Sequence, residues 1–157
     1  MDSVIDNLYV NKELYSALFE PICEKYRLTM TEILVLLFLA KNSGCDTASD
    51  IVEKLKIAKS HISASVRDLS ERGYLRGQFE GNNHRTIHLQ LCDSADEVVR
   101  EGMRVQEEYI SVISRGFNED EMGILRNYII RINENANKYL CNLKENSKRS
   151  LPTECTK

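Results

Sequence analysis

The sequence predicts a mainly helical protein that carries one small antiparallel β-hairpin. Along most of the chain, apolar residues recur every three or four positions, which is the period of an amphipathic helix. Residues 86–91 instead alternate strictly between polar and apolar, which is the period of a half-buried strand. Only two Pro and seven Gly occur among the 157 residues, so few breaks separate the helices.

Capping patterns mark where three helices begin. Thr29 and Asn118 each stand three residues before a glutamate, and Thr47 stands three residues before an aspartate. The cap side chain accepts a hydrogen bond from the first turn, and the acid returns one to the cap backbone. We expect helices at 29–42, 48–55 and 119–143. The first of these is apolar all round, so we place it at the centre of the fold.

Two further helices follow from the apolar period alone. Residues 3–26 place Leu14, Leu18 and Ile22 on one face, and residues 95–115 place Val99 and Met103 near one stripe. From residue 144 onward the chain is polar and is predicted to be a disordered tail.

The stretch AKSHISASVRDLSERGYL, residues 58–75, is a helix with an unusual solvent face. Ile62, Val66 and Leu69 form its buried stripe, and Gly73 fits a left-handed cap at its end. A helix that meets only water usually carries Glu, Lys and Gln. Here the opposite face begins with short hydroxyls, an alanine and one arginine, which suits close approach to another surface.

Residues 74–79 and 86–91 are predicted to pair as a hairpin around a polar turn at 80–85. Three helices followed by a hairpin is the order of a winged helix-turn-helix, with the quoted helix in the recognition position. Short side chains let such a helix approach base edges in a major groove about 12 Å wide, and an arginine can pair with guanine. The candidate DNA-contacting residues are Lys59, Ser60, His61, Ser63, Ala64, Arg67, His84 and Arg85.

The charge distribution fits a nucleic-acid partner locally although the whole chain is acidic, at net −3. Residues 54–76 hold six Lys or Arg and two acids, whereas residues 93–108 hold six acids and two Arg. The recognition segment is therefore basic and the helix behind it acidic, which is the footprint expected of an acidic protein that binds double-stranded DNA.

Several other classes find no support in the sequence. The first residues lack the pattern of a signal peptide, and the longest apolar run, residues 33–40, cannot span a bilayer. Five scattered Cys without a CxxC pair favour a reducing cytoplasm, and we expect no metal site and no cofactor. No phosphate-binding glycine motif, nucleophile elbow or evident triad indicates an enzyme.

At this point the chain resembles a known family. The segments LTMTEILVLLFLAKN, TASDIVEKLKIAKSHISASVRDLSERGYLRG, IHLQL and FNEDEMGILRNYIIRINEN look like the MarR family of bacterial winged helix-turn-helix transcription regulators. The resemblance implies an obligate homodimer that reads a pseudo-palindrome, with Arg85 where the family's wing arginine enters the minor groove. We expect this regulator to be a repressor. The resemblance divides the chain into a dimerisation helix at 1–28, a winged module at 29–92, dimerisation helices at 93–143 and a tail at 144–157.

The chain departs from the family pattern at several positions. Arg27 stands where glycine is usual, so the first helix lacks an easy left-handed cap. Ala58 replaces the serine or threonine that often caps the recognition helix, and of the usual wing pattern only Glu80 and Arg85 remain.

Alternatives to a simple DNA reader stay open. The resemblance implies a possible small aromatic or phenolic effector in the crevice between the dimer helices and the winged module. Some relatives sense peroxide through a first-helix cysteine near tyrosines, which makes Cys23, Tyr15 and Tyr26 redox or ligand candidates, although the sequence favours Cys23 as a small core residue. The winged module could also have been repurposed to bind a protein.

Overall fold

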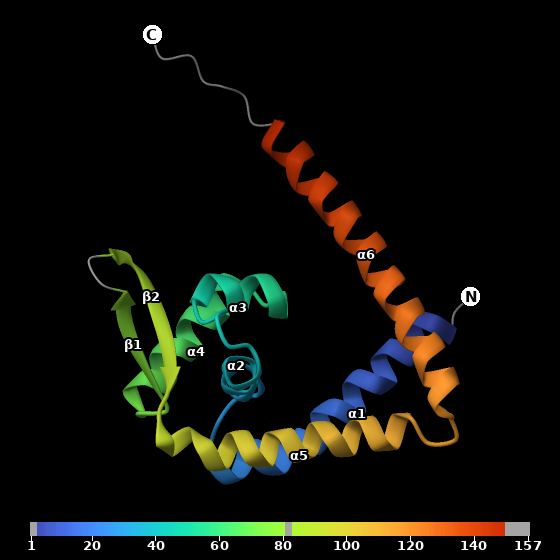
Figure 1. The fold of residues 1–157 in the computed structure, drawn as a ribbon, viewed down its shortest axis with the longest axis horizontal. Coiled ribbons are helices and arrows are strands. Elements are labelled where there is room, and N and C mark those ends of the chain that lie inside the picture. Colours follow the sequence, from blue (N-terminus) through green and yellow to red (C-terminus); the bar gives the residue numbers. More distant parts are fainter. Residues whose placement is uncertain (1–2, 81–82, 150–157) are drawn as a thin grey trace. The chain divides into compact units, whose positions relative to one another are not determined.

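A computed structural model describes residues 3–80 and 83–149, and the side chains of residues 9–79 and 86–143 (Figure 1). The described chain is mainly helical with a two-stranded antiparallel hairpin, as predicted. It falls into two compact units, one up to Ile113 and one from Ser114 onward. The elements in order are α1 (Ser3–Tyr26), α2 (Met30–Lys41), α3 (Ala48–Leu55), α4 (Lys59–Glu71), β1 (Leu75–Glu80), β2 (Asn83–Leu91), η1 (Asp93–Ala95), α5 (Asp96–Ile113) and α6 (Glu119–Arg149).

Helix α2 forms the centre of the first unit, as its continuous apolar sequence predicts. Figure 1 shows it nearly end-on, with α3 above it and the α1–α5 pair below. Ile33, Val35 and Leu36 have no exposed surface. Helices α1, α4 and α5 and strand β2 all pack against α2. Within the described residues no helix is long and apolar enough to cross a membrane.

The three predicted capping boxes are confirmed. The Thr29 Oγ1 accepts from the Glu32 amide at 3.2 Å, while the Glu32 carboxylate accepts from the Thr29 amide at 2.6 Å. The same reciprocal pair of bonds joins Thr47 to Asp50 and Asn118 to Glu121. Because both bonds lie within four residues, these helix starts are local properties of the sequence.

The end of α1 differs from the expectation drawn from its sequence. Arg27 adopts the left-handed conformation, at φ 51°, although it is not glycine. The Arg27 amide donates to the Glu24 carbonyl at 3.3 Å and the Leu28 amide to the Cys23 carbonyl at 3.0 Å, which is the Schellman arrangement. Leu28, only 3% exposed, then anchors the turn in the core. A long-range contact of the Arg27 carbonyl, described below, helps hold this conformation.

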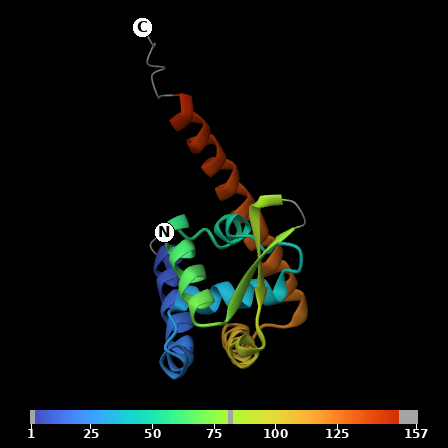
Figure 2. The same cartoon turned by 90° about the vertical axis from the view of Figure 1, so that its left-hand side faces the viewer.

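The hairpin pairs Leu75 with Leu91 and Phe79 with Ile87, and its register shifts between Phe79 and Glu80. Strand β1 ends at Glu80 and strand β2 begins at Asn83, so residues 80 and 83–85 belong to strands, which corrects the prediction of a turn over 80–85. Gly77 lies opposite the β2 strand so closely that an added Cβ would stand 2.7 Å from the Ile87 Cγ2. Figure 2 shows the two strands twisting around each other beside α4.

Helix α6 continues to Arg149, which corrects the prediction that a disordered tail begins at residue 144. Residues 144–149 include lysine, glutamate and arginine, which are strong helix formers and extend a helix that has already begun. Residues 150–157 lie outside the described part of the chain.

Candidate nucleic-acid interface

Helix α4 is positioned by its buried stripe and by its C-terminal cap. Ile62 and Leu69 are fully buried, Ser65 is nearly so, and Val66 is partly buried. Gly73 takes the left-handed conformation predicted for it, at φ 77°. Its amide donates to the Ser70 carbonyl and the Tyr74 amide to the Leu69 carbonyl, at 3.1 and 2.9 Å. The end of α4 is therefore fixed both by packing and by hydrogen bonds.

The opposite face of α4 collects the predicted contact residues. Lys59, Ser60, His61, Ser63 and Arg67 are exposed on this one helix, and Ala64 is half-buried. His61 and Ala64 also line a shallow cavity of about 240 Å³ that reaches the start of α2. The structure thus brings these six side chains onto one continuous surface.

The start of α4 has no side-chain cap. Ala58 occupies the N-cap and makes no side-chain hydrogen bond, as its sequence predicts. The His61 and Ile62 amides both donate to the Ala58 carbonyl, at 3.0 and 3.1 Å. The amides before them have no intrahelical carbonyl to bond, because they precede the first full turn.

Arg67 is paired with acids of its own helix. Its Nε donates to the Asp68 Oδ1 at 3.2 Å, its Nη2 lies 3.1 Å from the same oxygen, and the Glu71 Oε1 lies 4.0 Å from Nε. The Arg67 side chain is 66% exposed. Sequence reasoning counted these acids in the net charge but missed that they hold the guanidinium in the free protein.

The wing carries the two remaining predicted contacts. The backbones of His84 and Arg85 lie in β2, and their side chains fall outside the described residues. Phe79 and Ile87, which pair across the hairpin, are about half exposed. The minor-groove role of Arg85 therefore remains a prediction.

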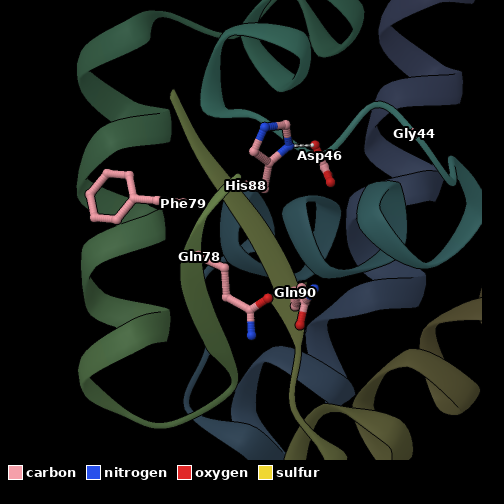
Figure 3. Close-up of a pocket in the computed structure, with 6 residues that line it drawn as sticks. All are labelled: Gly44, Asp46, Gln78, Phe79, His88 and Gln90. Atoms are coloured by element: carbon pink, nitrogen blue, oxygen red, sulfur yellow. Dashed lines mark hydrogen bonds and ion pairs between the residues drawn. The ribbon is translucent and has the colours of Figure 1, made fainter. Parts of the chain in front are cut away.

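His88 occupies a more protected place than its alternating position in the strand indicates. We predict a solvent-facing His88 from the sequence, but its Nδ1 lies 2.7 Å from the Asp46 Oδ1 and its side chain is 28% exposed. The Leu89 amide also donates to the Asp46 carbonyl, at 2.8 Å. Figure 3 shows this pair above Gln78 and Gln90, while Phe79 points away from them. Asp46 thus ties the base of the wing to the loop before α3.

Some cations of the basic segment, residues 54–76, make hydrogen bonds within the protein, and others are exposed near the start of α4. The Arg72 guanidinium donates to the backbone carbonyls of Tyr26 and Arg27 at the end of α1, and the Arg76 Nε donates to the Gln90 Oε1 at 3.1 Å. Lys54, Lys56 and Lys59 are exposed around the start of α4. The exposed lysines therefore lie near the N-terminal end of α4, where the short side chains begin.

The redox candidates lie along the contact of α1 with α5. The Tyr15 hydroxyl accepts from the Gln106 Nε2 at 2.9 Å, and its ring meets the Tyr109 ring edge-on. Burial raises the pKa of the Cys23 thiol, which lowers its thiolate fraction and hence its reactivity. Burial also raises the pKa of Tyr26. These surroundings favour a packing role for Cys23 over a sensing role.

No three His, Cys, Asp or Glu side chains of the described residues are grouped as a metal ion would require. The His61 and His88 side chains lie on different elements, α4 and β2.

The fold and this surface define a class of protein: a winged helix-turn-helix with a recognition helix whose exposed face suits the major groove. Residues 28–86 match the sequence model of the MarR family. The chain is 25% identical over 122 residues to the HTH-type transcriptional regulator BilQ of Clostridioides difficile strain CD3, which covers 75% of this chain and 77% of BilQ. Residues 28–86 are thus a winged helix-turn-helix segment of the MarR type, and the chain is similar to a transcription regulator over three quarters of its length.

Solved structures share the fold across most of the chain. A MarR family transcriptional regulator from Listeria monocytogenes, complexed with 26mer DNA, superposes with a TM-score of 0.78 at 18% identity and covers 90% of this chain and 93% of its own. BpsR of Bordetella bronchiseptica superposes with a TM-score of 0.67 at 18% identity and covers 83% and 98%.

Proposed function

We propose that this chain acts as a homodimeric repressor that reads a pseudo-palindromic duplex site through α4. The observation that carries the proposal is the exposed face of α4, where Ser60, Ser63 and Ala64 leave room for base edges and Arg67 stands beside them. Lys59 would neutralise a phosphate at the same end. A dimer that covers a promoter blocks it sterically, so repression is the simplest outcome. Such a regulator works where genomic DNA lies, and we expect it in the cytoplasm.

The Listeria relative supports a duplex partner, because that protein was crystallised with DNA. In this chain the predicted contacts lie on α4 and at the wing, the two elements that a winged helix presents to a duplex. Arg85 would enter the minor groove, where narrow A·T-rich segments attract arginine.

A second copy of the chain is the proposed partner of the helices outside the winged module, which are α1, α5 and α6. Helix α6 carries large apolar side chains at helical spacing that are exposed within its own unit: Leu125, Tyr128, Ile129, Ile132, Tyr139 and Leu140. An apolar stripe of this length is unfavourable in water and is typical of a helix that packs on another chain. Sedimentation of the wild-type protein should give a dimer. Ile129→Glu with Ile132→Glu should give a monomer, and a wild-type monomer would contradict the proposal.

A cavity at the junction of α2, α3 and α5 is the proposed effector site. It has a volume of about 180 Å³ and is lined by apolar side chains together with Lys41, Asn42 and Gln106, and the Lys41 ammonium donates to the Gln106 Oε1. An apolar floor with one ammonium at its edge suits a small aromatic or phenolic anion. BpsR is regulated in its DNA binding by 6-hydroxynicotinic acid. A panel of such acids should raise the unfolding temperature of the wild-type protein. The rise should be smaller for Lys41→Met, which lacks the ammonium group.

The central test is selection from a random duplex pool at moderate salt, followed by sequencing of the retained DNA, with Arg67→Ala beside the wild type. We expect a pseudo-palindrome with half-sites about one helical turn apart, blurred at one position per half-site in the variant. A wild-type dimer that enriches no sequence, with and without the acid panel, would refute DNA reading and favour a protein partner for the winged module.

A further inference from the structure

The contact between the end of the recognition helix and the end of α1 has no role in the function described so far. Arg72, the C-cap of α4, donates from Nη1 to the Arg27 carbonyl at 2.8 Å and from Nη2 to the Tyr26 carbonyl at 2.7 Å. Arg27 and Tyr26 lie 45 and 46 positions before Arg72 in the sequence. The guanidinium carbon also lies 5.3 Å from the centre of the Tyr74 ring. The side chain is thus held by two hydrogen bonds and an aromatic face.

The two acceptors are the carbonyl of Tyr26, the last residue of α1, and the carbonyl of Arg27, which follows it. The last carbonyls of a helix lack intrahelical donors and carry the negative end of the helix dipole, so a cation that donates to the Tyr26 carbonyl is well matched to it. Two donors from one planar group also fix direction, which a lysine cannot do. The left-handed Arg27 turns its carbonyl into this contact.

Helix α1 in turn is tied to α5 along its length. The Lys25 ammonium donates to the Glu101 carboxylate at 2.6 Å, which raises the pKa of Lys25 and lowers that of Glu101. The Gln106–Tyr15 bond adds a second tie further along the pair. Arg72 therefore joins the reading helix directly to the α1–α5 arm, which the proposed function assigns to the dimer.

We propose that Arg72 is a positioning residue that sets the location of each recognition helix relative to the dimer arm, and thereby the half-site spacing that the protein accepts. This inference rests on the proposed function. Two recognition helices must dock about 34–36 Å apart at the same time. A recognition helix that is free to shift about its C-terminal end can still read one half-site. The dimer, however, binds two half-sites at once with lower affinity, because both helices must first be ordered at the correct separation.

The test compares Arg72→Gln with Arg76→Gln. Both variants remove one positive charge from the basic segment, but among the described side chains Arg76 bonds a neutral group of the wing, the Gln90 amide. Each is measured on the selected full site, on a duplex with one half-site scrambled, and on duplexes with one or two base pairs inserted between half-sites. Arg72→Gln should lose at least about tenfold more affinity for the full site than for the half-site, and should discriminate less against insertions.

Arg76→Gln should lower the affinity for the full site and for the half-site in the same proportion and keep the spacing preference. Arg72→Lys should have an affinity for the full site between those of Arg72→Gln and wild type. If Arg72→Gln weakens full and half-sites alike, with the spacing preference intact, Arg72 contacts phosphate or supports folding and the inference is wrong.

Hydrogen exchange of the free protein separates this inference from the proposed function. Arg72→Gln should speed exchange of amides at residues 24–28 and 70–74 without loosening the core of α2. Unchanged exchange there would overturn the inference even if DNA binding is confirmed. Faster exchange in a protein that selects no DNA would confirm the link between the helices and refute the DNA reading alone.

Discussion

Arg67 gives the most direct test of whether this surface reads DNA as proposed, because the structure places acids beside Arg67 that compete with a base for its guanidinium. In the free protein its guanidinium pairs with Asp68 at 3.1 Å and with Glu71 at 4.0 Å, and its side chain is 66% exposed. Exposed ion pairs contribute at most about 1 kcal/mol each. A bidentate contact with guanine discriminates by about 1–3 kcal/mol. The two energies are close enough that the acids weaken the base contact without abolishing it.

Arg67→Ala should therefore reduce discrimination at one base position per half-site by about 5- to 150-fold, the factor equivalent to that energy range. Asp68→Asn should keep the preferred base and change affinity by less than about fivefold, since it removes only an exposed pair. Anisotropy competition with duplexes that each carry one substituted base pair measures both effects. Lys59→Ala is the control, because loss of a phosphate contact weakens all duplexes alike and lowers the salt slope by about one. Identical base penalties in Arg67→Ala and wild type would refute the reasoning.

Three further predictions concern caps and the wing. Ala58→Ser should stabilise the protein by about 0.5–1 kcal/mol in urea unfolding, because the N-cap of α4 lacks a side-chain acceptor, and a neutral result would mean that its first turn is already satisfied. The hydrogen bonds from the Thr47 hydroxyl and amide hold the pKa of Asp50 below its ordinary value, so its contribution to stability is complete above about pH 4 and is lost as pH falls through the lowered pKa. The difference in the free energy of unfolding between wild type and Asp50→Asn should accordingly become smaller in acid. A difference that stays constant from pH 7 to 3 would contradict the assignment. Arg85→Ala should weaken operator binding with little change in major-groove preference, and full affinity would exclude it as an anchor.

The features that sequence predicted correctly are those whose causes lie within a few residues. The capping boxes at Thr29, Thr47 and Asn118 and the glycine at 73 each specify a helix end through bonds to near neighbours. The buried stripe of α4 follows in the same way from its period. The exposed reading face followed from that stripe, because residues on the far side of a packed helix have only solvent or a ligand to meet.

The features that sequence missed join distant segments. His88 has no local signal for its bond to Asp46, which is 42 residues away, and an alternating strand alone places it in solvent. Local propensity alone makes Arg27 a poor residue for a left-handed helix end. The Arg72 bond to its carbonyl supplies a stabilising contact that no pattern around residue 27 reveals.

The two ends of α4 are built for different tasks. Its C-terminal end is held in the free protein by the left-handed Gly73 and by the Arg72 bonds to α1. Its N-terminal end begins at Ala58 without a cap and presents Lys59 and Ser60 to solvent. An oxygen acceptor from DNA would complete that first turn, so part of the energy of the helix becomes available only on binding. Ala58→Ser would supply the acceptor in advance, and the gain in stability should therefore bring little or no gain in DNA affinity.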